Sequence, residues 1–129
     1  MGLFFVLVGI KHFTDPAWFE PIVPDILGNS RIWVYISGVP EVLLGVAILI
    51  PKYRTWAGPS IALLLIILYW ANLNMWINDI PLNGKTYAAR WHILRGLAQI
   101  VLISIALWLS DWSISIFAKK KAKYESYDK

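Results

Sequence analysis

The chain has 129 residues, of which 58% are hydrophobic and 16% are charged, with eight tryptophans and no cysteine. The length suits one domain, and the lack of cysteine excludes disulfides, iron–sulfur clusters and thiolate zinc sites. A soluble domain carries about 25% charged residues. The low charge therefore predicts a protein that folds in a lipid bilayer.

Four apolar segments follow one another along the chain, and we expect each to be helical. Three of them, at about residues 31–51, 56–76 and 91–112, have the roughly 20 residues that a span of about 30 Å requires. The first, residues 1–13, covers only about 20 Å as a helix. We predict an all-α fold, an integral membrane four-helix bundle whose first helix is short or N-terminally trimmed and whose second helix is kinked by Pro40. The transmembrane domain would occupy residues 1–117, and a basic cytoplasmic tail residues 118–129.

The connections contain residues that end helices. Pro16, Pro21 and Pro24 predict a loop or a broken interfacial segment between the first two helices, because proline cannot continue a helix. Residues 51–54 predict a tight turn. Asn83-Gly84 predicts another turn between the third and fourth helices.

The basic residues predict the orientation. Seven lysines and arginines fall on the face that holds the turn at residues 51–54 and the tail, against four on the other face. By the positive-inside rule, both termini lie in the cytoplasm of a bacterial-type inner (plasma) membrane. The net charge of +4 therefore indicates contact with the lipid bilayer and not with nucleic acid. The predicted membrane anchors are Trp33, Trp56, Trp76, Trp91, Lys119, Lys120, Lys121 and Lys123.

A few polar residues lie within the apolar segments, where they are costly and usually face other helices. At 1.5 Å per residue, Glu41 and Gln99 lie roughly 15 Å from the outer face, Arg95 about 9 Å and Asn72 about 6 Å. One polar group from each helix thus falls in the outer half of the bilayer. The candidate ligand-binding residues are His12, Glu41, Asn72, Arg95 and Gln99.

Each of these residues also has a purely structural interpretation. Glu41 and Arg95 either form a buried ion pair that joins the second and fourth helices, or line a pocket for a quinone, a lipid or another small ligand. His12 is either a proton relay or pocket donor, or an interfacial histidine bonded to a loop carbonyl. A haem between His12 and His92 is a third reading, although His92 suits an interface position better. The segment with Trp18, Phe19, Ile22 and Val23 either anchors the chain or covers the pocket.

No catalytic set is evident in the sequence. It has no serine or cysteine nucleophile with a base, no metal-spaced group of His, Asp and Glu, and no phosphate loop. Whether the protein is an enzyme therefore stays open. If it takes part in an oxidoreductase reaction, a cofactor or a partner protein supplies the chemistry.

Several short motifs along residues 9–100 are found together. They comprise Gly9, His12-Phe13, Pro16, Phe19, Val23-Pro24, Tyr35, Ser37-Gly38, Glu41, Gly45, Leu49-Ile50-Pro51, Arg54, Ala71-Asn72, Met75, Arg95, Leu97 and Gln99. In these motifs the chain resembles the DoxX family. It departs from that pattern at Gly96-Leu97-Ala98, where many relatives have a proline, and in its shorter first helix.

The resemblance implies a DoxX-like four-helix membrane protein from a family named after a small subunit of a thiosulfate:quinone oxidoreductase. We therefore expect an accessory or quinone-facing subunit of a membrane redox system, with a redox partner protein and quinone as the candidate cofactor. One alternative is a module that binds or transports a small lipophilic ligand. Another is a structural or assembly protein without a ligand.

Overall fold

The computed structural model describes residues 1–125, and beyond residue 111 it describes the side chains of Ser115 and Ala118 alone. This part of the chain is helical, with an isolated bridge between Leu82 and Lys85 as its β-structure. The long helices are α1 (Gly2–Thr14), α2 (Ser30–Leu49), α3 (Arg54–Ile77) and α4 (Ala89–Glu125). Short 3-10 helices fill the connections: η1 (Pro16–Trp18), η2 (Glu20–Ile22), η3 (Asp25–Leu27) and η4 (Pro51–Tyr53). The predicted all-α fold is confirmed.

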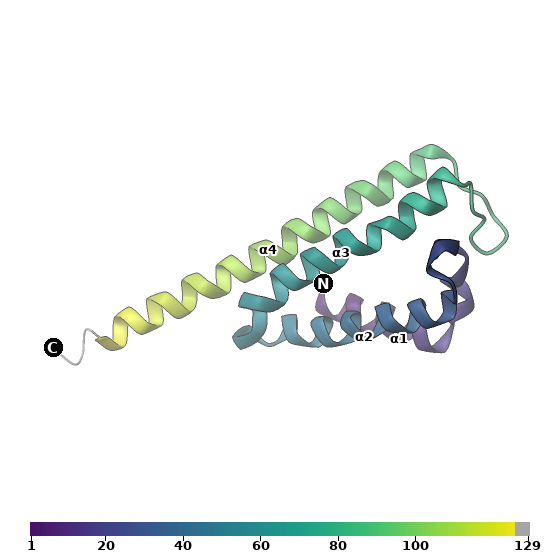
Figure 1. Cartoon of the computed structure of the whole chain (residues 1–129). Helices are drawn as coiled ribbons and strands as arrows, with labels where there is room; N and C mark the ends of the chain where they lie inside the picture. The colour runs from purple at the N-terminus through teal and green to yellow at the C-terminus, as the bar shows by residue number, and fades with distance from the viewer. Residues whose placement is uncertain (126–129) are drawn as a thin grey trace.

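The helices form two hairpins. α1 packs along α2, α3 packs along α4, and the contact between α2 and α3 joins the two pairs. Figure 1 shows that the hairpins meet near the turn between α2 and α3 and diverge away from it. The predicted four-helix bundle is thus not confirmed, because the four helices do not run side by side over their whole length.

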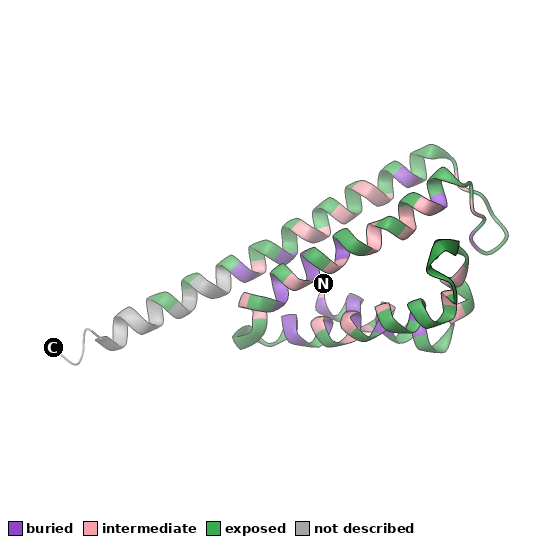
Figure 2. Cartoon of the chain, in the orientation of Figure 1, coloured by how far each residue is buried: buried purple, intermediate pink, exposed green. Residues whose placement is uncertain are grey.

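The core lies where the hairpins meet. Its buried members come from all four long helices and are Phe5, Ala47, Ile48, Ala57, Ile61, Leu65 and Ala106. Ser110 of α4 donates a hydrogen bond to the carbonyl oxygen of Thr55 at 2.9 Å, which fixes α4 against the start of α3. Figure 2 shows buried residues gathered around this end and exposed ones along the outer faces of the helices.

The outer faces of the helices are apolar. Leu63, Trp70 and Ile100 are 59%, 65% and 62% exposed, which would be unfavourable over so large a surface in water. Three helical segments are long and apolar enough to cross a membrane: Ser30–Leu49, Pro51–Ile77 and Ala89–Asp111. α1 is apolar but shorter. The architecture is compatible with a location in a membrane.

The turns follow the predicted signals. Pro16 begins η1 directly after α1, and Pro51 begins η4 directly after α2. Asn83 and Gly84 have φ angles of 53° and 73°, and Leu82 and Lys85 on either side exchange backbone hydrogen bonds of 3.0 and 3.2 Å. Two successive residues with positive φ, between the two residues of an isolated bridge, form the tight turn that Asn-Gly favours. Pro40 lies inside α2, as expected.

The C-terminal helix is longer than expected. We expected the fourth apolar segment to end at about residue 112, but α4 continues to Glu125. Its backbone therefore includes Lys119, Lys120, Lys121 and Lys123, whose side chains lie outside the described residues. The start of the predicted tail is thus a continuation of the last helix.

Candidate functional site

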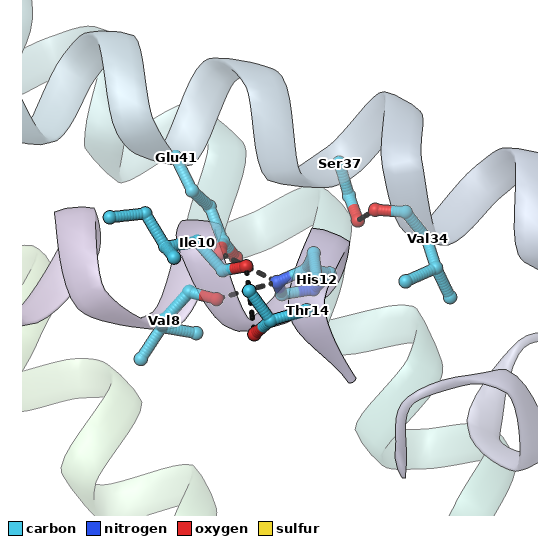
Figure 3. A network of polar contacts seen from close by, with 7 residues as sticks. All are labelled: Val8, Ile10, His12, Thr14, Val34, Ser37 and Glu41. Carbon is cyan, nitrogen blue, oxygen red and sulfur yellow. Dashed lines mark hydrogen bonds and ion pairs between the residues drawn. The ribbon is translucent and has the colours of Figure 1, made fainter. Parts of the chain in front are cut away.

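A histidine and a glutamate face each other between α1 and α2 (Figure 3). His12 and Glu41 are each 6% exposed, and His12 Nδ1 lies 3.3 Å from Glu41 Oε2 and 2.9 Å from the carbonyl oxygen of Val8. Both neighbours of Nδ1 are acceptors, so Nδ1 carries a proton. Glu41 Oε2 is buried and receives no well-formed hydrogen bond from the described residues. The pair is therefore close but incompletely satisfied.

Glycines make room for this pair. A Cβ at Gly38 would lie 2.7 Å from Cβ of His12, and a Cβ at Gly9 would lie 3.0 Å from Cβ of Glu41. Gly2 lies seven residues before Gly9, and Gly45 lies seven residues after Gly38. A Cβ at Gly2 would lie 2.7 Å from the carbonyl oxygen of Gly45, so the two helices are equally close there. Because small residues let helix backbones approach closely, the glycines on both helices bring His12 against Glu41.

The segment between α1 and α2 covers the pair on one side. The ring of Phe19 stacks on the ring of His12, with 3.9 Å between centroids and 17° between planes. Asn74 of α3 donates a hydrogen bond to the carbonyl oxygen of Ile22 at 3.2 Å, and Arg31 pairs with Glu20 at 2.5 Å. These contacts hold the segment in place. Phe19 belongs to the segment that we considered as a cover for the pocket. It lies against His12, one of the predicted site residues.

The other predicted site residues lie elsewhere. Arg95 Nη1 contacts the sulfur of Met75 at 3.2 Å, and its guanidinium lies 5.0 Å from the centre of the Tyr87 ring. Gln99 donates a hydrogen bond to the carbonyl oxygen of Leu65. Asn72 is half-buried on α3. All of these contacts are within the α3–α4 hairpin and its loop.

The predicted pairing of Glu41 with Arg95 is therefore wrong. Among the described residues, the acid pairs with His12 and the arginine has no carboxylate within ion-pair distance. Similar depth along two helices did not bring the two side chains together, because α2 and α4 belong to hairpins that diverge. The single four-helix pocket that we expected is replaced by two separate polar clusters.

Sequence reasoning underestimated His92. This residue is 4% exposed, its ring stacks on Trp76 at 5.5 Å, and its Nε2 lies 3.2 Å from the carbonyl oxygen of Tyr87. It is thus buried within the α3–α4 hairpin. Its position three residues before Arg95 places both on one face of α4, which is the signal that was available. The contacts of His12 and His92 lie in different hairpins, so they give no support to a haem between them.

Among the described residues, no three or more His, Asp or Glu side chains are grouped so that they could hold a metal ion. Surface grooves lie along α3 at Trp70 and Asn74, and between α3 and α4 at Tyr69 and Gln99. Neither is lined by His12 or Glu41. With Phe19 in its present place, the His12–Glu41 pair is covered.

The tryptophans predicted as anchors lie near helix ends. Trp33 and Trp91 are close to the first residues of α2 and α4, and Trp56 and Trp76 lie at the two ends of α3. They are between 37% and 51% exposed. This is the arrangement that aromatic belts adopt at membrane interfaces, although anchoring itself stays a prediction.

Comparison with known families gives one result. A family model described as "Domain of unknown function (DUF8561)" matches residues 1–110. The chain belongs to this family. The match covers α1, α2, α3 and most of the apolar part of α4, and it overturns the resemblance to DoxX. No curated protein and no solved structure matches the chain.

Proposed function

We propose that the protein is an integral membrane protein that binds the polar ring of a quinone at His12 and Glu41, as an accessory subunit of a membrane redox system. The observation that carries the proposal is the buried His12–Glu41 pair in an apolar hairpin. Polar groups inside apolar helices are costly and usually serve a function. Neither the family nor its description adds to this argument.

The shape of the site favours a planar ligand. Phe19 already places a six-membered ring face to face with His12, at 3.9 Å. A quinone ring has a similar size and planarity, and the hydroxyl groups of its reduced form donate hydrogen bonds. We propose that the segment at residues 15–29 moves aside and the quinone ring replaces Phe19. The polar contacts of His12 among the described residues use Nδ1, so Nε2 is the nitrogen available to the ligand. With the proton of the neutral ring on Nδ1, Nε2 accepts a hydrogen bond, which a hydroxyl of the reduced quinone donates.

The ligand proposal predicts which variant loses quinone. Wild-type protein is purified from its membrane in mild detergent, and it should carry quinone that organic extraction and mass spectrometry detect. Glu41→Gln should carry at least about tenfold less quinone, because the acid no longer orients His12. Asp111→Asn makes the same chemical change at an exposed residue of α4 and should retain quinone. A different lipophilic molecule retained by wild type and lost in Glu41→Gln would favour the alternative of a lipophilic-ligand module. Absence of any ligand in wild type would contradict both.

We further propose that all four long helices lie in a bacterial-type inner membrane with both termini in the cytoplasm. Gly2 contacts Gly45 and Leu49, and Ser110 contacts Thr55. These contacts support the orientation, because they place the chain's start, the turn with Lys52 and Arg54, and the second half of α4 at one end. The positive-inside rule assigns the more basic end to the cytoplasm.

A reporter fusion tests the orientation. Alkaline phosphatase fused after residue 129 should be inactive and green fluorescent protein at the same position should be fluorescent, because the first needs the periplasm and the second the cytoplasm. Fusions within the loop at residues 79–88 should give the opposite result. Phosphatase activity at the C-terminus would reverse the proposed orientation.

A further inference from the structure

A cluster of basic and aromatic side chains lies where the α3–α4 loop meets its two helices. We call it the Arg95 cluster, and it consists of Met75, Trp76, Tyr87, His92 and Arg95. Tyr87 links the cluster, because its carbonyl oxygen contacts His92 and its ring lies beside Arg95. This cluster shares no residue with the His12–Glu41 pair.

Arg95 has more hydrogen-bond donors than the protein satisfies. A guanidinium carries five N–H donors and no acceptor. Among the described residues, its polar contact is the thioether sulfur of Met75 at 3.2 Å, which is a weak acceptor. The ion pairs of the described residues involve Glu20 and Glu41 with other partners. A half-buried arginine in an apolar helix therefore lacks the anion that such residues normally contact.

His92 adds a second unsatisfied group to the cluster. Its Nε2 faces a carbonyl oxygen at 3.2 Å, so Nε2 carries the proton of the neutral ring and Nδ1 is an acceptor. Nδ1 is buried and has no hydrogen-bond partner among the described residues. The cluster thus presents donors without an acceptor and an acceptor without a donor.

The position of the Arg95 cluster along α4 indicates which kind of anion can reach it. Helical side chains lean toward the N-terminus of their helix, and Arg95 accordingly reaches the ring of Tyr87, which precedes α4. The guanidinium is therefore near the end of the membrane-spanning segment that begins at Ala89. Lys85 adds positive charge at the same end. Lipid phosphates occupy this level of a bilayer.

We propose that the Arg95 cluster binds the phosphate of an anionic phospholipid headgroup. A phosphate oxygen pair matches the planar fork of a guanidinium. A headgroup that also carries hydroxyls, such as phosphatidylglycerol, supplies a donor for His92. The lipid chains would lie along the apolar outer face of the α3–α4 hairpin, where Ile93, Leu97 and Ile100 are exposed.

Native mass spectrometry of the purified full chain tests the proposal. Delipidated protein is titrated with phosphatidylglycerol or with phosphatidylcholine of the same acyl chains. We expect wild type to prefer phosphatidylglycerol by about tenfold or more, and Arg95→Gln to lose that preference. Arg95→Lys, which keeps the charge but not the fork, should keep a reduced preference and covers the case in which Arg95→Gln does not fold.

The matched control is Arg90→Gln, which removes the same charge at an exposed position of the same helix end. It should keep the preference for phosphatidylglycerol. Equal losses in Arg90→Gln and Arg95→Gln would overturn the site, since the attraction would then be a general effect of surface charge. Glycerol phosphate at millimolar concentration should not displace the lipid. Its displacement of the lipid would identify a site for a soluble anion and overturn the lipid assignment.

Discussion

Replacing His12 with phenylalanine is expected to destabilise the protein by about 1–3 kcal/mol, the cost of leaving a buried polar group without its partner. The group left behind is the carboxyl of Glu41, which is 6% exposed and whose Oε2 has its ion-pair contact with His12 Nδ1 at 3.3 Å. Phenylalanine keeps a ring to stack on Phe19, so loss of packing contributes little. The cause of the effect is therefore the unpaired acid.

A double-mutant cycle separates this cause from general loss of packing. His12→Phe, Glu41→Leu and the double variant are compared with wild type by thermal unfolding in detergent. We expect the double variant to be more stable than His12→Phe alone, since replacing both polar partners with apolar groups removes the unpaired acid. Strictly additive losses would contradict a direct interaction between the two side chains.

Gly45, which lies where α1 and α2 pack against each other, should be equally sensitive to substitution. A Cβ at Gly45 would lie 2.8 Å from the backbone nitrogen of Val6 and 2.9 Å from the carbonyl oxygen of Gly2. Backbone atoms cannot rotate away, so Gly45→Ala forces the helices apart at a cost of about 1–3 kcal/mol. The better helix propensity of alanine offsets about 1 kcal/mol of this. We expect a net loss of up to about 2 kcal/mol.

Gly96→Ala is the matched control for this prediction. A Cβ at Gly96 would meet the hydroxyl oxygen of Tyr69 at 2.8 Å, and that atom is the far end of a side chain that can move. The same substitution should therefore be neutral or slightly stabilising there. Thermal unfolding of both variants in the same detergent checks the difference. A Gly45→Ala variant as stable as Gly96→Ala would mean that α1 and α2 are not in close contact in the membrane.

The helices could be predicted because their signals are local. Apolar runs of about 20 residues and the prolines between them placed α2, α3 and the start of α4 to within a few residues. The Asn83-Gly84 turn depends on backbone conformations that these two residue types favour. α4 extends beyond its apolar segment because alanine and lysine after residue 117 change the polarity of the chain without ending a helix.

The site could be predicted only in part, because pairing across helices depends on which faces meet. Counting residues gives the depth of Glu41 and Arg95 but not the direction in which either side chain points. α2 turns the acid toward α1, and α4 turns the arginine toward Tyr87 and Met75. The two residues thus belong to different hairpins. His12 and Glu41 were both selected, but their contact was not foreseen.

The mistaken family resemblance has a similar origin. Gly9, Gly38 and Glu41 formed part of the motif, and the structure shows that these residues bring two helices into close contact around a buried polar pair. Any membrane hairpin that packs closely needs small residues at such positions. Short motifs of this kind therefore indicate how helices pack rather than which family a protein belongs to.

The length of α4 has a mechanical consequence. The helix has 37 residues, or about 55 Å at 1.5 Å per residue, and it continues without a break for 14 residues past Asp111, the end of its apolar segment. These 14 residues form a lever arm of about 21 Å. If α4 tilts by about 10°, the far end of this arm moves by about 4 Å. A small tilt of the apolar segment would thereby produce a larger displacement of the helix end that includes Lys119, Lys120, Lys121 and Lys123.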